Sequence, residues 1–210
     1  MTINDIMLKA PVIPVLVMDG TIDPAALAET LVAAGLPVIE VTLRTPGALV
    51  ALKAMADVSG AVVGAGTVLN KAMLGQAIDA GSRFIVSPGL TEPLGKAAID
   101  SGVPFLPGIA TAGDIMRGLD LGLDRFKFFP AEAAGGLSAL KALAGPFGDI
   151  RFCPTGGIRE DSASQWLGHP SVLCVGGSWL VPTGETDLAA IGERARRAAR
   201  LATSDQLARP

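Results

Sequence analysis

Lys127 lies in the middle of an apolar, aromatic run, Phe126-Lys127-Phe128-Phe129-Pro130-Ala131-Glu132. If this run is a buried strand, the lysine needs an explanation, because lysine is almost never fully buried without a partner. One explanation is that the side chain snorkels to the surface or caps an edge. The other is that it points into a closed site, where desolvation disfavours the ammonium form and leaves a nucleophilic amine.

A carboxylate and a guanidinium lie close together in Val38-Ile39-Glu40-Val41-Thr42-Leu43-Arg44. Side chains alternate between the two faces of a strand, so Glu40, Thr42 and Arg44 are expected to share one face. Polar groups on the inner face of a sheet are costly to bury unless they are paired. Two interpretations stay open. One is a structural Glu40–Arg44 ion pair; in the other, Glu40 moves protons while Arg44 binds a carboxylate through its planar fork.

Two pairs of glycines follow predicted strands near the end of the chain, in Pro154-Thr155-Gly156-Gly157-Ile158 and in Gly176-Gly177-Ser178-Trp179. Each pair alone would also fit a simple turn. Barrels that bind phosphate commonly hold it between the loops after the last two strands, on backbone N–H groups and a helix N-terminus. We therefore expect phosphate to bind at Gly156 and Gly157, with Ser178 as a hydroxyl donor.

Two further turns are expected to line the same site. Thr67 follows Gly64-Ala65-Gly66, where small residues leave room for a ligand or a bulky neighbour, and its hydroxyl can form a hydrogen bond. Pro88 lies in Ser87-Pro88-Gly89-Leu90, which is expected to shape the pocket as a backbone wall. The glycines before Thr67 do not form a GxGxxG fingerprint, and the chain contains no Walker sequence.

The composition argues against several classes of protein. The 210 residues are 50% hydrophobic and 18% charged, with a formal net charge of −3 and one histidine. This net charge, without a basic patch, argues against nucleic-acid binding. The sequence shows no spacing typical of metal ligands, and neither a metal nor a cofactor is expected. Apolar runs end before the roughly 20 residues of a membrane span, and no secretory signal is recognisable. Cys153 and Cys174 fit buried, reduced thiols of a cytoplasmic protein.

Short β-branched runs alternate with helical stretches rich in Ala and Leu. After a short N-terminal helix at 2–9, within segment 1–10, the pattern predicts strands at 12–17, 38–43, 61–66, 84–87, 105–107, 125–129, 150–153 and 172–175. It predicts helices at 24–34, 47–56, 71–80, 92–101, 112–121, 136–143, 159–167 and 188–202. Eight βα units without a composition break favour an α/β fold closed into a (β/α)8 TIM barrel, one domain over residues 1–210. A doubly wound open sheet is the alternative, and residues 203–210 are expected to be a frayed tail.

In a barrel, chemistry takes place at the C-terminal ends of the strands, and the residues singled out above fall there. A desolvated lysine, a carboxylate, an arginine and a phosphate site suit Schiff-base chemistry on a keto acid that bears a remote phosphate. A phosphosugar epimerase or isomerase would need a second acid–base residue facing Glu40 and would give Lys127 no task. A phosphosugar-binding barrel without catalysis is a further alternative.

The sequence closely resembles the 2-keto-3-deoxy-6-phosphogluconate (KDPG) aldolases, the class I Schiff-base aldolases of the Entner–Doudoroff pathway. The similarity runs in order through nearly the whole chain. The segments that carry it are Pro14-Val15, Ile39-Glu40-Val41-Thr42-Leu43-Arg44-Thr45, Val63-Gly64-Ala65-Gly66-Thr67-Val68-Leu69, Ser87-Pro88-Gly89-Leu90, Pro107-Gly108-Ile109, Phe126-Lys127-Phe128-Phe129-Pro130-Ala131-Glu132, Arg151-Phe152-Cys153-Pro154-Thr155-Gly156-Gly157-Ile158 and Gly176-Gly177-Ser178-Trp179-Leu180-Val181-Pro182.

The resemblance implies a (β/α)8 barrel that is typically a homotrimer. It implies a lyase that cleaves 2-dehydro-3-deoxy-6-phospho-D-gluconate reversibly to pyruvate and D-glyceraldehyde 3-phosphate, so its partners are the phosphorylated keto acid and pyruvate. An aldolase for 4-hydroxy-2-oxoglutarate, or for 2-dehydro-3-deoxy-6-phosphogalactonate, is the alternative on the same site. Lys127 would form the Schiff base, and Glu40 would shuttle protons through water.

The remaining site residues are also implied by the resemblance. Arg44 would hold the pyruvate carboxylate, with Thr67 forming a hydrogen bond nearby. The substrate phosphate would bind at Gly156, Gly157 and Ser178. One departure matters: many relatives carry a basic residue near the position of Val17, so phosphate binding here is expected to depend more on backbone groups.

Overall fold

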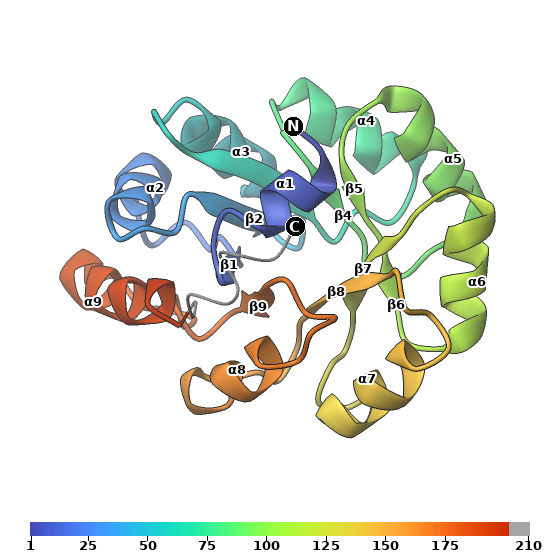
Figure 1. Ribbon diagram of the computed structural model, residues 1–210. Helices are drawn as coiled ribbons and strands as arrows, with labels where there is room; N and C mark the ends of the chain where they lie inside the picture. Colours follow the sequence, from blue (N-terminus) through green and yellow to red (C-terminus); the bar gives the residue numbers. More distant parts are fainter. Residues whose placement is uncertain (202–210) are drawn as a thin grey trace.

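Helices alternate with parallel strands along residues 1–201, the part of the chain that the computed structural model describes (Figure 1). The elements are α1 (Ile3–Met7), β1 (Val12–Leu16), α2 (Pro24–Ala33), β2 (Val38–Thr42), α3 (Ala48–Ala56), β3 (Val62–Gly66), α4 (Lys71–Asp79), β4 (Ile85–Val86), α5 (Glu92–Ser101), β5 (Phe105–Leu106), β6 (Gly108–Ile109), α6 (Ala112–Asp120), β7 (Arg125–Phe128), α7 (Gly136–Ala144), β8 (Arg151–Pro154), α8 (Glu160–Leu167), β9 (Val175–Gly177) and α9 (Leu188–Ala199).

The strands form two parallel sheets, ordered β5-β4-β3-β2-β1-β9 and β6-β7-β8. Only Pro107 separates β5 from β6, and parallel bridges from Phe152 to Val172 and from Thr155 to Gly176 connect the other ends of the two sheets. The strand order runs in sequence from β5 to β1, without the reversal of a doubly wound sheet. The fold is therefore an α/β fold with curled parallel sheets, and the helices surround the strands (Figure 1).

The larger hydrophobic core lies between the strands and the surrounding helices. Ile39 and Val41 belong to it, as do Phe126 and Phe128, together with the buried faces of α2 to α9. These four side chains alternate with polar ones along β2 and β7, as period-two strand geometry requires. The alternation predicted from the sequence is confirmed, because the apolar set faces the helices and leaves Glu40 and Lys127 on the opposite face.

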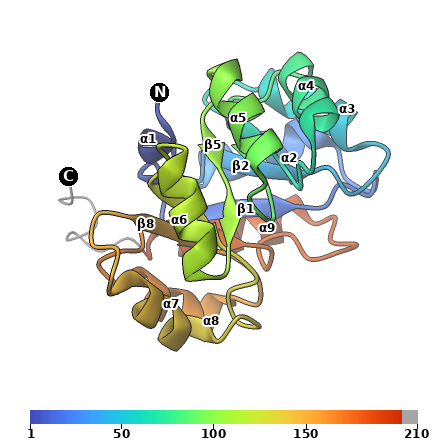
Figure 2. The same ribbon diagram turned by 90° about the vertical axis from the view of Figure 1, so that its right-hand side faces the viewer.

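A second apolar cluster fills the interior at the N-terminal ends of the strands. Ile6 and Met7 of α1 pack there with Ile13, Phe84 and other buried side chains. Figure 2 shows α1 at one end of the strands. The helix begins with a capping box between Thr2 and Asp5, and the Arg125 Nε–H at the start of β7 donates to Asn4 Oδ1 at 2.8 Å. Buried side chains therefore fill this end of the interior.

Most predicted elements are confirmed, with boundaries shifted by a residue or two, but three predictions need correction. The strand predicted at 172–175 is wrong: β9 is Val175–Gly177, so the glycine pair expected in a loop lies in the strand. The strand predicted at 105–107 is divided at Pro107, which has no N–H to contribute to a ladder, although its carbonyl accepts from the Lys127 N–H at 2.9 Å. The last helix ends at Ala199 rather than at residue 202.

Residue 202 and the predicted frayed tail at 203–210 lie outside the described residues. Within residues 1–201, no helix combines the length and the apolar character that crossing a membrane requires.

Candidate active site

The Lys127 amine and the Glu40 carboxylate meet in the interior. Lys127 Nζ lies 3.0 Å from Glu40 Oε1 and 3.3 Å from Oε2, although the two residues are far apart in the sequence. The side chains are only 5% and 4% exposed. Lys127 therefore does not snorkel, and the closed-site interpretation of the aromatic run is the one that the structure supports. The alternative Glu40–Arg44 ion pair is wrong, because the Glu40 carboxylate binds Lys127 instead.

The aromatic neighbours of Lys127 fix the direction of its side chain. Phe126 packs toward α6, where a Cβ on Gly118 would lie 2.3 Å from the Phe126 ring. Phe128 packs toward α8, with its ring centroid 6.3 Å from that of Trp166. Because neighbouring side chains on a strand point to opposite faces, burying both phenyl rings outside the sheet directs Lys127 inward.

A buried ion pair of this kind is costly as a structural device. Desolvating two charges costs several kcal/mol each, and the attraction between them often only balances that cost. The sequence led us to expect a neutral amine, but here the amine is in direct contact with an acid. A nucleophilic, uncharged amine therefore requires transfer of one proton to Glu40, across a hydrogen bond that already exists.

Arg44 lies in the turn after β2, two residues beyond the end of the strand that carries Glu40. Its Nε–H donates to Thr67 Oγ1 at 3.1 Å, so the two residues predicted to bind the pyruvate carboxylate are brought together. Thr67 has a φ of 59°, which is rare for a residue other than glycine and strains the backbone by about 1–3 kcal/mol. Such strain is found at functional sites, where the surrounding structure holds the residue in place.

Two hydroxyl groups on either side of Arg44 attach its segment to the neighbouring part of the chain. Thr42 Oγ1 donates to the carbonyl of Leu16 at 2.7 Å, and Thr45 Oγ1 donates to the carbonyl of Met18 at 2.6 Å. These bonds connect β2 and its following turn to the end of β1 and to the loop after it. Our sequence reasoning gave Thr45 no role, although its position directly after Arg44 was the available signal.

The predicted phosphate turn has the backbone conformation that only glycine adopts easily. Gly156 and Gly157 have φ values of 103° and 80°. The bridge between Thr155 and Gly176 places this turn beside the end of β9, and the exposed Ser178 follows that strand. The structure thus brings the two glycine-containing segments together, as predicted.

Phe129 connects the amine with the phosphate turn. Its ring centroid lies 5.4 Å from Lys127 Nζ, and a Cβ on Gly156 would lie 3.3 Å from the same ring. The predicted wall residue Pro88 packs elsewhere in the site, against β6: a Cβ on Gly108 would lie 2.2 Å from the Pro88 carbonyl oxygen. Phe129 is a site residue that our sequence reasoning missed, although it belongs to the aromatic run around Lys127.

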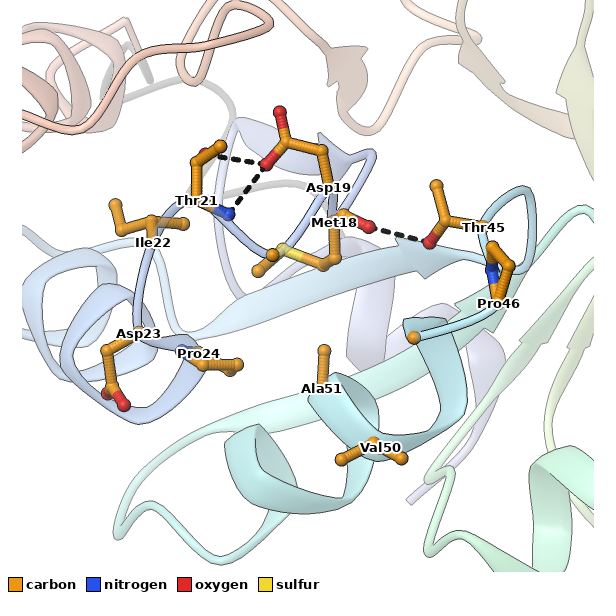
Figure 3. A pocket seen from close by; sticks show the side chains of 12 residues that line it. Met18, Asp19, Thr21, Ile22, Asp23, Pro24, Thr45, Pro46, Val50 and Ala51 are labelled. Atoms are coloured by element: carbon orange, nitrogen blue, oxygen red, sulfur yellow. Dashed lines mark hydrogen bonds between the residues drawn. The ribbon is translucent and has the colours of Figure 1, made fainter.

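A pocket of about 850 Å³ lies at the rim, between the loops that follow β1 and β2 (Figure 3). Its lining includes Asp19, Asp23 and Thr45 but not Lys127 or Glu40, so it lies beside the buried pair rather than around it. None of the lysines and arginines among the described residues lines it, and exposed Val17 precedes the loop. The two aspartates of this lining would repel a phosphate.

The two cysteines, Cys153 and Cys174, are free and buried, as predicted. A hydrogen bond with Cys153, together with burial, raises the pKa of the Cys174 thiol well above its ordinary value. A thiol in this environment is a poor nucleophile.

Comparison with known proteins points to the same chemistry. Residues 3–194 match the family model described as KDPG and KHG aldolase. A 2-dehydro-3-deoxy-phosphogluconate aldolase of Zymomonas mobilis is 60% identical over 196 residues, covering 93% of this chain and 94% of that protein.

Two solved structures are also similar. The 2-keto-3-deoxy-6-phosphogluconate aldolase of Zymomonas mobilis ZM4, with 3-phosphoglycerate, gives a TM-score of 0.94 at 58% identity and covers 96% of this chain and 97% of that one. The KDPG aldolase of Legionella pneumophila, with pyruvate captured as a covalent carbinolamine, gives 0.90 at 41% identity and covers 95% and 98%.

Proposed function

We propose that this chain, which belongs to the KDPG and KHG aldolase family, cleaves 2-dehydro-3-deoxy-6-phospho-D-gluconate reversibly to pyruvate and D-glyceraldehyde 3-phosphate. It is a class I aldehyde-lyase, which uses a lysine Schiff base. The observation that carries the proposal is the buried Lys127 amine in contact with Glu40. The hydrogen bond between Arg44 and Thr67 and the positive φ of Gly156 and Gly157 support it.

The reaction begins with formation of a covalent bond. Glu40 accepts a proton from Lys127, and the free amine then adds to the C2 keto carbon of the substrate. Loss of water from the resulting carbinolamine, with Glu40 returning the proton that the departing hydroxyl needs, gives an iminium ion. The covalent carbinolamine of pyruvate in the Legionella pneumophila relative supports this step.

The iminium ion accepts the electron pair of the bond that breaks. Glu40, through a water molecule, removes the proton of the C4 hydroxyl, the C3–C4 bond breaks, and its electrons form an enamine while the aldehyde leaves. The enamine is then protonated at C3, and water hydrolyses the iminium ion to pyruvate and free Lys127. One carboxylate therefore serves every proton transfer, and Glu40 is the one buried carboxylate among residues 1–201.

Binding groups at the two ends of the substrate fix its orientation. Arg44 holds the carboxylate with its guanidinium, whose position is set by the hydrogen bond to Thr67. The phosphate binds to backbone N–H groups of Gly156 and Gly157 and to the Ser178 hydroxyl, and Pro88 forms part of the wall. The 3-phosphoglycerate in the Zymomonas mobilis structure shows that this relative binds a phosphorylated three-carbon acid.

A second candidate substrate is 4-hydroxy-2-oxoglutarate, because the description of the matching family includes KHG aldolase. The 6-phosphogalactonate analogue is a third. These compounds share the keto acid end that Lys127 and Arg44 recognise and differ at the other end or at C4. Rates of cleavage of the three, compared side by side, decide the order of preference.

We also propose that the two sheets form one closed (β/α)8 barrel, as a single domain, and that the protein is a cytoplasmic homotrimer. The bridges of Phe152 to Val172 and Thr155 to Gly176, and the short interval at Pro107, support closure. Resemblance to the family supports the trimer. Sedimentation at several protein concentrations tests the assembly.

Reductive trapping tests the catalytic proposal. Borohydride added with pyruvate is expected to attach a reduced pyruvate adduct to Lys127, located by peptide mass spectrometry, while a lactate-dehydrogenase-coupled assay measures pyruvate release. Lys127→Ala is expected to lose both signals. Lys96→Ala, which removes an exposed lysine paired with Glu92, is the matched control and should keep both. Folded protein that remains unlabelled at Lys127 would refute the mechanism.

A further inference from the structure

We propose that Glu132 is a positioning residue, which holds the Gly156–Gly157 turn at the distance from Lys127 that the phosphate of the substrate requires. The inference rests on the proposed function, because it assigns that turn to the phosphate. Glu132 is the last residue of the aromatic run that contains Lys127. It therefore connects the covalent site to the far end of the substrate without contacting either reacting atom.

The main chain around Glu132 is hydrogen-bonded to the turn. The Ala131 N–H donates to the Thr155 carbonyl at 2.8 Å, and the Glu132 N–H donates to the Gly156 carbonyl at 3.0 Å. These bonds extend the pairing of β7 with β8 beyond the strand ends. They fix the carbonyl side of the turn and leave the orientation of the following N–H groups to other contacts.

The Glu132 side chain supplies those contacts. Its methylene groups occupy the space beside Gly157, where an added Cβ would lie 2.7 Å from both Glu132 Cβ and Cγ. Its Oε1 accepts a hydrogen bond at 3.2 Å from the Trp166 Nε1–H of α8. Trp166 is only 2% exposed and packs on Phe128, so it is a rigid anchor. One side chain thus touches the turn and is attached to the helix that follows it.

This arrangement predicts a specific defect rather than a general one. Without the Glu132 side chain, Gly157 gains space, and the positive φ of two successive glycines leaves the turn free to change conformation. The phosphate-binding N–H groups would then lose their orientation, whereas Lys127, Glu40 and Arg44 would keep theirs. Binding of the phosphate should weaken, and chemistry on pyruvate alone should not.

Kinetics on two reactions of the intact enzyme test the proposal. For Glu132→Ala, the KM for 2-dehydro-3-deoxy-6-phosphogluconate is expected to rise about tenfold, which is the effect on binding of losing one hydrogen bond. The kcat is expected to change by less than about threefold. Exchange of the pyruvate methyl protons in deuterated water, which needs the Schiff base and Glu40 but no phosphate, should stay within about twofold of wild type. Glu132→Gln, which keeps the methylene groups and an oxygen acceptor for Trp166, should restore the KM.

The outcomes separate the possibilities. A parallel loss of cleavage and pyruvate exchange in Glu132→Ala, or an unchanged KM, would overturn the positioning role. If Glu132→Ala does not fold, Glu132→Asp, whose carboxylate is one methylene short of Trp166, provides the same comparison. Failure of the proposed function looks different: wild-type protein would then neither cleave the phosphorylated substrate nor exchange pyruvate protons.

Discussion

Gly66 and Glu40 lie side by side on adjacent strands, and the absence of a side chain at Gly66 creates the space that the Glu40 carboxylate occupies. A Cβ on Gly66 would lie 2.2 Å from Glu40 Oε1 and 2.7 Å from Glu40 Cγ. Gly66 pairs in register with Thr42, two positions along β2 from Glu40, so both residues face the same side of the sheet. The glycine at the end of β3 is therefore a requirement of the Lys127–Glu40 pair rather than a feature of a turn.

Gly66→Ala is expected to displace the Glu40 carboxylate from Lys127. Inserting a methyl group into a packed interior costs about 1–3 kcal/mol of folding stability. A shift of the acid by about 1 Å is expected to reduce kcat about 100-fold. The coupled pyruvate assay and thermal unfolding measure the two effects.

Gly75→Ala is the control for that experiment. Gly75 lies in α4, and a Cβ there would meet nothing within 4 Å. Alanine favours helix over glycine by about 1 kcal/mol, so this variant should be slightly more stable and fully active. Equal activity of the Gly66 and Gly75 variants would contradict the role assigned to Gly66.

Glu40→Gln is expected to preserve the geometry of the site but to slow every proton transfer. The amide has the size of the carboxylate but cannot accept and return protons, and loss of a general acid–base commonly costs about 10²–10⁴ in rate. We expect kcat for cleavage and the exchange of pyruvate methyl protons to fall together. Borohydride trapping at Lys127 should still occur, more slowly, because the nucleophile is retained. Normal exchange with lost cleavage would assign the proton transfers to another group.

The sequence predicted the direction of Lys127 because the information is local. Two phenylalanines flank the lysine, and alternation on a strand places them on one face and the lysine on the other. The repeating βα pattern, from the strand at Val12–Leu16 onward, could also be predicted from the sequence. Short connections between buried strands and amphipathic helices allow few topologies of the chain.

The partner of Glu40 could not be predicted in the same way. Arg44 is close to Glu40 in the sequence, whereas Lys127 is 87 positions away, and nothing local indicates which strands approach across the interior. The strand β9 was misplaced for another reason. Its Gly176-Gly177 pair has a composition typical of turns, but a Cβ on Gly176 would lie 2.2 Å from Thr155 Oγ1, so a tertiary contact demands glycine within the strand.

Arg44→Lys tests the carboxylate-binding role. A lysine keeps the positive charge but loses the planar fork and the Nε–H that bonds to Thr67. The KM for pyruvate in the condensation direction is expected to rise about tenfold or more, with a smaller change in kcat. Arg83→Lys is the control, because Arg83 is exposed and precedes β4 at the opposite end of the strands. An unchanged KM in Arg44→Lys would remove Arg44 from the site.

The thiols should be unreactive in the native protein. The hydrogen bond with Cys153 and burial raise the pKa of Cys174 well above its ordinary value, so the thiol remains protonated at pH 8. Burial also shields Cys153. Ellman's reagent is therefore expected to react with neither cysteine under native conditions and with both in denaturant. Rapid native labelling would show that the interior opens more readily than this packing allows.

Asp114 should make the folding stability decrease as the pH becomes acidic. Burial favours its neutral form, but hydrogen bonds from the Ala110 and Thr111 N–H groups and the Thr111 hydroxyl outweigh it, and Arg117 adds attraction, so the pKa of Asp114 is lowered. A lowered folded-state pKa means that the contribution is present above the ordinary value of about 4 and is lost as pH falls through the folded-state value.

Asp114→Ala removes this contribution at every pH. At pH 7 the variant is expected to be less stable by about 1–2 kcal/mol, the range for a helix cap, because Asp114 completes the capping box of α6. As the pH decreases below about 4, wild-type protein loses the same interactions by protonation, so the two unfolding free energies should converge. Urea unfolding from pH 7 to pH 3 measures the difference. Asp120→Ala, at the other end of α6, is the control, and its unfolding free energy should differ from that of wild type by less than about 0.5 kcal/mol at every pH. If the difference in unfolding free energy between Asp114→Ala and wild type stayed constant with pH, the assigned protonation of Asp114 would be contradicted.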